Sequence, residues 1–326
     1  MKFQPKKWLP GLGYSFALSA IAWVVAPWIP GVNAVLMGLI LGMLVGNVFK
    51  PTELLSPGIS EASSTVLELA IILLAFGAGF DKLSSLGWST VGMIAVTVLV
   101  MLILTSILSR YMNCPRSTGL LVGFGTTICG SSAIAAVSPA IVEEKQDIGI
   151  ALAVVNLLGG LFMILMPLGL MQFPELEEHA GLMIGATLHS VGNVAGAGYT
   201  IGEAAGLEAV AVKMIRVALL APAVILFSLI NGKRSGSSFW SQFRLPYYLW
   251  LFFGVSLLVT WVPMPELVLS GAGFGADFLL TTAMVAIGLN TGFGRLYRSG
   301  RRAVGFGAVL FGFQVGVVLL LVELFL

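Results

Sequence analysis

The chain has 326 residues, of which 58% are apolar and only 10% are charged, with a net charge of +2. Globular chains carry about 25% charged residues, so 17 basic and 15 acidic side chains cannot cover a soluble protein of this size. The composition predicts an all-α protein embedded in a lipid bilayer, and it excludes the basic field that a nucleic-acid-binding protein needs. Two cysteines, Cys114 and Cys129, are too few for a disulfide framework.

Eleven apolar runs approach the length of a membrane helix, about 20 residues. They lie near residues 11–29, 32–49, 62–80, 88–109, 118–142, 148–170, 181–202, 207–230, 246–262, 272–293 and 303–325. The fifth and seventh runs are rich in Gly, Ser, Thr and Asn, so we expect them to be the least regular spans.

Lysine and arginine in the loops orient the spans, because cytoplasmic loops carry an excess of both. With the N-terminus inside and eleven crossings, only Lys82 and Lys145 of the loop cations lie outside. We therefore expect a cytoplasmic N-terminus and an external C-terminus. The first apolar run is too long for a signal peptide and is kept as a span.

Many transporters consist of two inverted repeats. The eleven spans divide into an extra helix at residues 1–31 and two five-span repeats at 32–170 and 181–326, all within one membrane domain. This register makes the fifth and tenth spans equivalent, and both hold a polar stretch beside glycines. It predicts that these two spans are a pair of discontinuous helices.

Two short self-similarities do not fit that register. Residues 125–128 (GTTI) resemble 185–188 (GATL), and residues 79–83 resemble 292–296. Such matches arise by chance in a chain rich in Gly, Leu and Ala, so the register is given the greater weight.

Small and polar residues interrupt the fifth span and form the first candidate site. They are Thr126, Thr127, Cys129, Gly130, Ser131 and Ser132. A helix broken at Gly130 would start its second half with free N–H groups and a positive dipole end, which bind anions. Ser131 or Ser132 can cap that half-helix and donate a hydroxyl. Close packing of small residues is the alternative interpretation.

The tenth span offers Asn290 and Thr291 as the matching interruption, although an ordinary helix end before the basic loop would have the same sequence. Asn156 in span 6 and Gln314 in span 11 occupy equivalent helices in the register. Each would flank the broken helix of its own repeat, or would hydrogen-bond between helices.

The seventh span carries His189 and Asn193, which are four residues apart and share a helix face. A histidine inside the membrane is a candidate functional residue that can pair with an anion or relay a proton. Simple hydrogen bonding between helices is the alternative.

The eighth span carries Lys213 and Arg216, three residues apart. The arginine fork suits carboxylate, sulfate or phosphate, so both cations are candidate substrate ligands. Pairing with Glu68 in span 3 or Asp277 in span 10 is the alternative.

Enzyme signatures are weak. Cys129 and His189 could form a nucleophile and base, but no acidic orienter is evident and no HExxH, GxSxG or Walker sequence occurs. We therefore expect no catalytic residue, metal or cofactor.

Three stretches carry a family resemblance: ICGSSAIAAVSPAI (128–141), GATLHSVGNVAGAG (185–198) and VKMIRVALLAPAV (212–224). They resemble the YeiH-type family of bacterial inner-membrane proteins, described as sulfate exporters, within a wider group of bile-acid symporters and sodium/proton antiporters. The resemblance covers essentially the whole chain and implies inverted five-helix repeats, broken helices that cross near the midplane, and a homodimer. The antiporters hold acidic ligands beside the crossing where this chain has Asn156, so carboxylate-based exchange is not implied.

These observations favour a secondary transporter of a small anion (sulfate, a sulfonate or a small organic acid) in the bacterial inner membrane. Spans 4–6 and 9–11 are expected to move as a core against spans 2, 3, 7 and 8, with the coupling ion open between H⁺ and Na⁺. One alternative is a cation or proton antiporter that uses Glu68, Asp277 and His189. A more distant one is a membrane-embedded enzyme that uses Cys129.

Overall fold

The computed structural model describes residues 5–29, 32–49, 51–77, 86–141, 145–231, 247–290 and 301–325, which are helical apart from short connections. Among them, six segments are long and apolar enough to span a membrane: Lys7–Trp28, Ser56–Leu74, Gly87–Tyr111, Asp147–Leu170, Glu266–Asn290 and Arg302–Phe325. A bent pair of helices, with a 42° angle, makes a seventh candidate. The prediction of an all-helical membrane protein with several spans is confirmed.

The chain folds into two compact units. The first contains Met1–Ser84, Ala195–Leu207 and Tyr247–Phe293, and the second contains Ser85–Val194, Glu208–Pro246 and Gly294–Leu326. Each unit draws segments from both predicted repeats. These compact units do not coincide with the predicted core and panel: spans 9 and 10 group with spans 2 and 3, whereas most of span 8 groups with spans 4–6 and 11.

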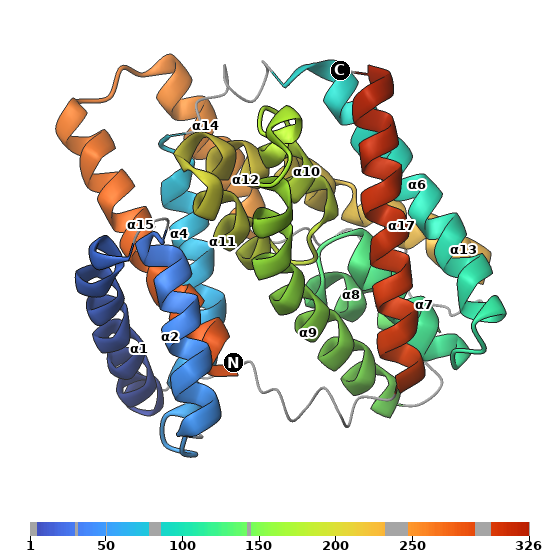
Figure 1. Ribbon diagram of the computed structural model, residues 1–326, viewed down its shortest axis with the longest axis horizontal. Coiled ribbons are helices and arrows are strands. Elements are labelled where there is room, and N and C mark those ends of the chain that lie inside the picture. The colour runs from blue at the N-terminus through green and yellow to red at the C-terminus, as the bar shows by residue number, and fades with distance from the viewer. Residues whose placement is uncertain are drawn as a thin grey trace. The chain divides into compact units, whose positions relative to one another are not determined.

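The first unit is built around the long helix α15. Its helices are α1 (Pro5–Val25), η1 (Ala26–Trp28), α2 (Ala34–Val48), α3 (Ser56–Glu61), η2 (Ala62–Val66), α4 (Leu67–Leu74), α14 (Tyr247–Trp261) and α15 (Glu266–Asn290). In Figure 1, α1 and α2 lie side by side, and both pack against α15. Buried Ile59, Val285 and Leu289 belong to the apolar core where α3 and η2 meet α15.

Glycines let α2 and α15 approach until their backbones touch. Gly38, Gly42 and Gly46 recur every fourth residue on α2, which is a small-residue packing pattern of membrane helices. A Cβ atom on Gly42 would lie 2.2 Å from the carbonyl oxygen of Val285. From the other side, a Cβ atom on Gly288 would lie 2.5 Å from the carbonyl oxygen of Leu39. This close contact explains why span 10 belongs with span 2.

The interruption predicted for span 10 is not found up to Asn290. Helix α15 continues from Glu266 to Asn290, and Gly288 is an ordinary helical residue within it. Thr291 lies outside the described residues. Gly288 therefore serves close helix packing rather than a change of chain direction.

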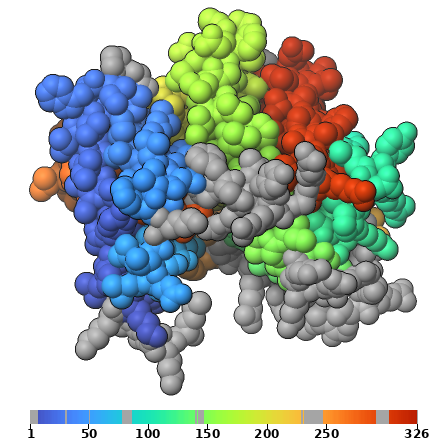
Figure 2. Space-filling model, turned by 60° about the horizontal axis from the view of Figure 1, so that its bottom comes forward, coloured from blue at the N-terminus to red at the C-terminus, as the bar shows by residue number. Residues whose placement is uncertain are grey.

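The second unit contains the remaining helices. They are α6 (Gly87–Tyr111), α7 (Arg116–Thr127), α8 (Ser131–Ile141), α9 (Lys145–Leu170), η3 (Pro174–Leu176), α10 (Ala180–Thr187), α13 (Leu220–Asn231), α17 (Arg301–Phe325), the first turn of α11 (Val191–Ile201) and most of α12 (Glu203–Ala218). Helix α17 packs against α6, α7, α9 and α10, and it is visible beside α9 in Figures 1 and 2. It thus connects the long helices α6 and α9 to the short helices α7 and α10.

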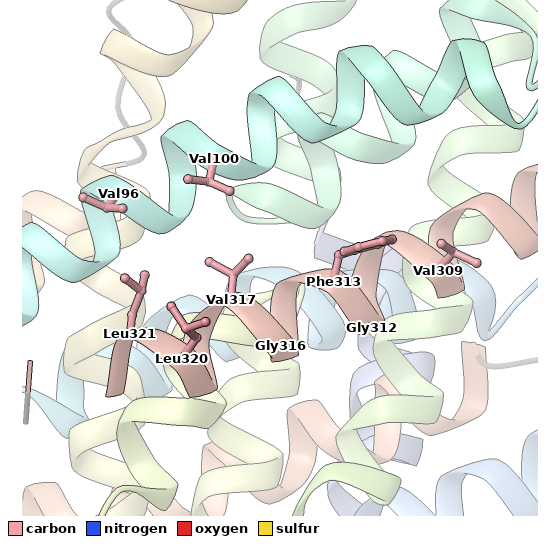
Figure 3. Close-up of a pocket in the computed structure, with 9 residues that line it drawn as sticks. All are labelled: Val96, Val100, Val309, Gly312, Phe313, Gly316, Val317, Leu320 and Leu321. Atoms are coloured by element: carbon pink, nitrogen blue, oxygen red, sulfur yellow. The ribbon is translucent and has the colours of Figure 1, made fainter. Parts of the chain in front are cut away.

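An apolar groove of about 570 Å³ runs between α6 and α17. Figure 3 shows Val96 and Val100 of α6 facing Val317 of α17, and all nine lining residues are Val, Leu, Phe or Gly. No lining side chain can donate a hydrogen bond to a polar ligand. The polar chemistry of this unit lies instead at its broken helices.

The α2–α15 contact predicts a specific cost for added bulk. Gly42→Ala should lower the free energy of unfolding by about 1–3 kcal/mol, because the new methyl group would collide with the α15 backbone. Gly13→Ala is the matched control, since a Cβ atom on Gly13 of α1 meets nothing within 4 Å. Thermal unfolding of both variants in detergent measures the difference. Equal melting temperatures would contradict the backbone contact.

Candidate functional site

Two of the predicted spans are broken in the second unit. Helix α7 ends at Thr127 and α8 starts at Ser131, while α10 ends at Thr187 and α11 starts at Val191. At the first break, Gly130 has φ +77°, a conformation that only glycine adopts at little cost. The predicted break in span 5 is confirmed. A second described break lies in span 7.

The two breaks follow equivalent sequences. The hydroxyl of Thr127 donates to the carbonyl of Gly123 at 2.8 Å, and the hydroxyl of Thr187 donates to the carbonyl of Met183 at 2.7 Å. Each threonine is the last residue of its helix. The match between residues 125–128 and 185–188 therefore marks two equivalent helix ends, and its interpretation as chance was wrong.

The starts of α8 and α11 lie next to each other. A Cβ atom on Gly130 would lie 3.6 Å from the Cβ atom of Ser190 and 3.7 Å from the carbonyl oxygen of His189. The Ser190 hydroxyl accepts the N–H of Asn193 at 3.2 Å and caps α11. The first N–H groups of a helix have no partner within it, so two sets of such donors meet at Gly130 and Ser190.

Lys213 of α12 binds both breaks. Its side chain is fully buried, and its Nζ donates to the carbonyls of Ile128 at 2.8 Å, Leu188 at 2.7 Å and His189 at 2.8 Å. An ammonium has three N–H bonds, and all three are used here. Lys213 therefore holds the two breaks together and has no proton left to donate to a substrate.

Arg216, one turn further along α12, does the same and is also fully buried. Its Nε donates to the carbonyl of Thr127 at 2.6 Å, and its Nη2 donates to that of Thr126. Its Nη1 donates to the carbonyl of Leu188 at 3.0 Å, with a longer contact to Gly185 at 3.4 Å. The two cations thus neutralise the negative C-terminal ends of α7 and α10.

The alternative that these cations pair with Glu68 or Asp277 is not borne out, because every hydrogen bond that they donate goes to a main-chain carbonyl. The two carboxylates belong to the first unit. There, Glu68 accepts the hydroxyl of Tyr247, and Asp277 is half-buried on α15.

Helices α7 and α10, which end at the breaks, are the outer half-helices. Their N-terminal ends, opposite the breaks, carry acids. At the start of α7, Asp147 accepts the hydroxyl of Thr118 at 2.7 Å and also that of Ser117. At the start of α10, Glu208 accepts the N–H of Leu182. Helices α7 and α10 therefore have a carboxylate at the positive end and a cation at the negative end. Sequence reasoning missed both acids, since nothing in the chain order links them to these helices.

Helices α8 and α11, which start at the breaks, are the inner half-helices. Their N-termini have no such carboxylate among the described residues. Ser131 and Ser132 are exposed at the start of α8, whereas Cys129 is buried beside the Ser132 hydroxyl and the Ala133 N–H. The charged groups that act on the Cys129 thiol are Lys213 and Arg216. The meeting point of the two N-termini is thus electropositive.

His189 and Asn193 are both buried at the second break. The His189 ring stacks on Phe311 of α17 with centroids 5.4 Å apart, and Asn193 packs against Gly159 of α9. Neither ring nitrogen of His189 has a hydrogen-bond partner. Phe311 was missed from the sequence, because its only signal is an aromatic side chain in an apolar span.

The other predicted polar residues are divided. Gln314 is buried and donates to the carbonyl of Ala186 at 2.9 Å, so it supports the end of α10. Asn156 is exposed on α9, and its surroundings therefore do not match those of Gln314. Asn290 is half-buried at the end of α15 and belongs to the first unit.

These features define a multi-span helical membrane protein with two discontinuous helices and a buried, cation-backed polar site. The chain belongs to the family described as Conserved hypothetical protein 698, which matches residues 10–307. The resemblance to the YeiH-type family is confirmed by the relatives that follow.

The chain is 31% identical over 324 residues to the UPF0324 inner membrane protein YeiH of Escherichia coli K12, covering 94% of this chain and 91% of the relative. It is 31% identical to the UPF0324 membrane protein PA5383 of Pseudomonas aeruginosa, with coverage of 96% and 93%. A UPF0324 membrane protein of Lactiplantibacillus plantarum is 27% identical, with coverage of 98% of each chain. No solved structure matches the chain.

The carbonyl contacts of Arg216 predict a large structural cost for its removal. Arg216→Gln should lower the free energy of unfolding by about 3–5 kcal/mol, because buried carbonyls lose charge-assisted donors. Arg302→Gln removes an exposed cation from α17 and should change it by less than about 0.5 kcal/mol. Denaturation of both variants in detergent compares them. Similar stability of Arg216→Gln and the unaltered protein would show that the cation does not hold the breaks.

Proposed function

We propose that the protein is a secondary transporter of a small anion (sulfate, a sulfonate or a small organic acid) that works by alternating access in the bacterial inner membrane. The observation that supports it is the pattern of charge at the four half-helix ends. The outer half-helices are neutralised at both ends, whereas the N-termini of α8 and α11 meet without a carboxylate among the described residues. An anion is the ligand that completes this pattern.

The electrostatics favour an anion over a neutral ligand. Each helix N-terminus carries about half a positive charge, so the two together offer roughly one. Lys213 and Arg216 are fully buried and donate to carbonyls at the same two breaks. An oxyanion has several equivalent oxygens that can accept the free N–H groups and the exposed hydroxyls of Ser131 and Ser132 at once.

The same pattern disfavours the two alternatives. A cation antiporter needs a carboxylate beside the N-termini of α8 and α11, but the charged groups that act on Cys129 there are Lys213 and Arg216, and Glu68 already accepts the hydroxyl of Tyr247. A cysteine-based enzyme needs a base on Cys129, but neither nitrogen of His189 hydrogen-bonds to it. Anion transport needs only the free N-termini of α8 and α11 and the two buried cations, which the structure already brings together.

The proposal includes eleven crossings with a cytoplasmic N-terminus, kinship with the bile-acid symporters and sodium/proton antiporters, and a homodimer. The loop cations support the orientation, since positive loops stay inside. The two breaks support the kinship, because open backbone at membrane depth is tolerated only where it is buried in protein or lines a cavity.

A built-in carboxylate should block the site. Ser131→Asp places a negative charge at the start of α8, where it stabilises the helix but occupies the place of the anion. Uptake of labelled sulfate, methanesulfonate or succinate into proteoliposomes should fall at least tenfold. Loss of about 1.4 kcal/mol of binding free energy corresponds to that factor.

Ser138→Asp is the matched control for this experiment. Ser138 lies in the same helix, where its hydroxyl donates to the carbonyl of Ala135, away from the break. This variant should transport like the unaltered protein. No uptake of any tested anion by the unaltered protein, or equal uptake by both aspartate variants, would remove the proposed site.

A further inference from the structure

His189 is the buried polar side chain that the folded chain leaves most incomplete. Its ring is fully buried, yet neither Nδ1 nor Nε2 has a hydrogen-bond partner. Buried polar groups without a hydrogen-bond partner destabilise the folded state. The residue nevertheless sits at the second helix break, with its own carbonyl bound by Lys213 at 2.8 Å. A ligand that binds reversibly would supply the missing hydrogen-bond partner.

The surroundings of the ring come from four directions. Phe311 of α17 stacks on it at an interplanar angle of 15°, and Phe162 of α9 stacks on Phe311 with ring centroids 3.8 Å apart. The charged groups that act on the imidazole are Lys213 and Arg216 of α12. The same two cations act on the Cys129 thiol at the other break. No carboxylate among the described residues acts on the ring.

Two cations already lie at the breaks beside His189, since Lys213 donates to the His189 carbonyl and Arg216 donates to the Leu188 carbonyl. Burial and two nearby positive charges both disfavour a third positive charge. A neutral imidazole has one donor and one acceptor, whereas an imidazolium has two donors. An anion beside the ring reverses the balance, since it offsets the cations and accepts hydrogen bonds from a protonated ring.

We infer that His189 takes up a proton when the anion binds, so that anion and proton occupy the site together and H⁺ is the coupled ion. This inference rests on the proposed anion transport and names its coupling ion. The carbonyl oxygen of His189 lies 3.7 Å from the position of a Cβ atom on Gly130, so His189 belongs to the place where the two N-termini meet and where the anion is proposed to bind. No other histidine is available for this role in the second unit's breaks, because the chain has two histidines and the other, His179, precedes α10.

Linkage fixes the sign of the pH dependence. If anion binding promotes protonation, then protonation must promote anion binding by the same factor. Anion affinity should therefore rise as the pH falls. It should weaken by up to about tenfold per pH unit in the range where the empty site is neutral and the loaded site is protonated.

Calorimetry of the full-length protein in detergent provides the test. Methanesulfonate is titrated at neutral pH in buffers of different ionisation enthalpy, and the dependence of the heat on that enthalpy gives the protons taken up. A sulfonate carries no titratable proton near neutral pH, so uptake reports on the protein. Up to one proton should enter for each anion bound.

The two histidines supply matched variants. His189→Gln should abolish proton uptake, and its affinity for methanesulfonate should lose its pH dependence. His179→Gln should keep both, since His179 lies outside the break. The second variant also leaves His189 as the only histidine, so ring ¹⁵N chemical shifts report its protonation directly and do not depend on whether His189→Gln folds.

The outcomes separate the two ideas. No binding of methanesulfonate, sulfate or succinate would overturn the proposed function. Binding without proton uptake, or with uptake that persists in His189→Gln, would overturn this inference alone. Unchanged ¹⁵N shifts of His189 in the His179→Gln protein on anion binding would also overturn it.

Discussion

The second unit depends on two buried cations, Lys213 and Arg216. Together they donate seven hydrogen bonds to main-chain carbonyls at the two helix breaks. Open carbonyls cannot be left in hydrocarbon, and a buried cation cannot be left without partners. Here the cations satisfy the open carbonyls, and the carbonyls satisfy the buried cations. The two cations differ in shape: the compact ammonium of Lys213 donates to three carbonyls, whereas the fork of Arg216 reaches two segments of the chain, at Thr126–Thr127 and at Gly185–Leu188. Since both residues bind both breaks, they also set the distance between α8 and α11.

A consequence is that the site obtains its positive field without exposing a charged side chain. The carboxylates Asp147 and Glu208 hold the outer ends, and the cations hold the inner carbonyls. What remains uncompensated are backbone N–H groups, which neither move nor lose rotamer freedom when a ligand arrives. A site made of fixed dipoles can release its ligand more easily than one made of flexible cations, because the cations are already bound elsewhere. Weak, preorganised binding of this kind suits a transporter, which must let go of its substrate.

The sequence predicts an all-helical membrane protein correctly, because long apolar runs are typical of membrane helices, whereas the number of crossings is not confirmed. It predicts the break at Gly130 as well, where Gly, Ser and Thr cluster. It fails at Gly288, because glycine serves two purposes: at Gly130 it provides φ +77°, and at Gly288 it lacks a Cβ atom that would strike α2. Composition does not distinguish these uses. The second break was harder to predict because Ser190 stands where the first break has glycine.

The partners of Lys213 and Arg216 could not be predicted either, since carbonyl oxygens belong to every residue and leave no mark in the sequence. Charge pairing suggested Glu68 and Asp277, which the fold places in another unit. The same limit explains why Asn156 was taken as a stand-in for an acidic ligand. A carboxylate at the crossing would neutralise the two inner N-termini permanently and leave room for a cation. Under the proposed proton coupling, a histidine that is neutral in the empty site would leave the field intact for an anion and become charged only in its presence. The choice between these two side chains at the break thus decides the sign of the ion that the fold can carry.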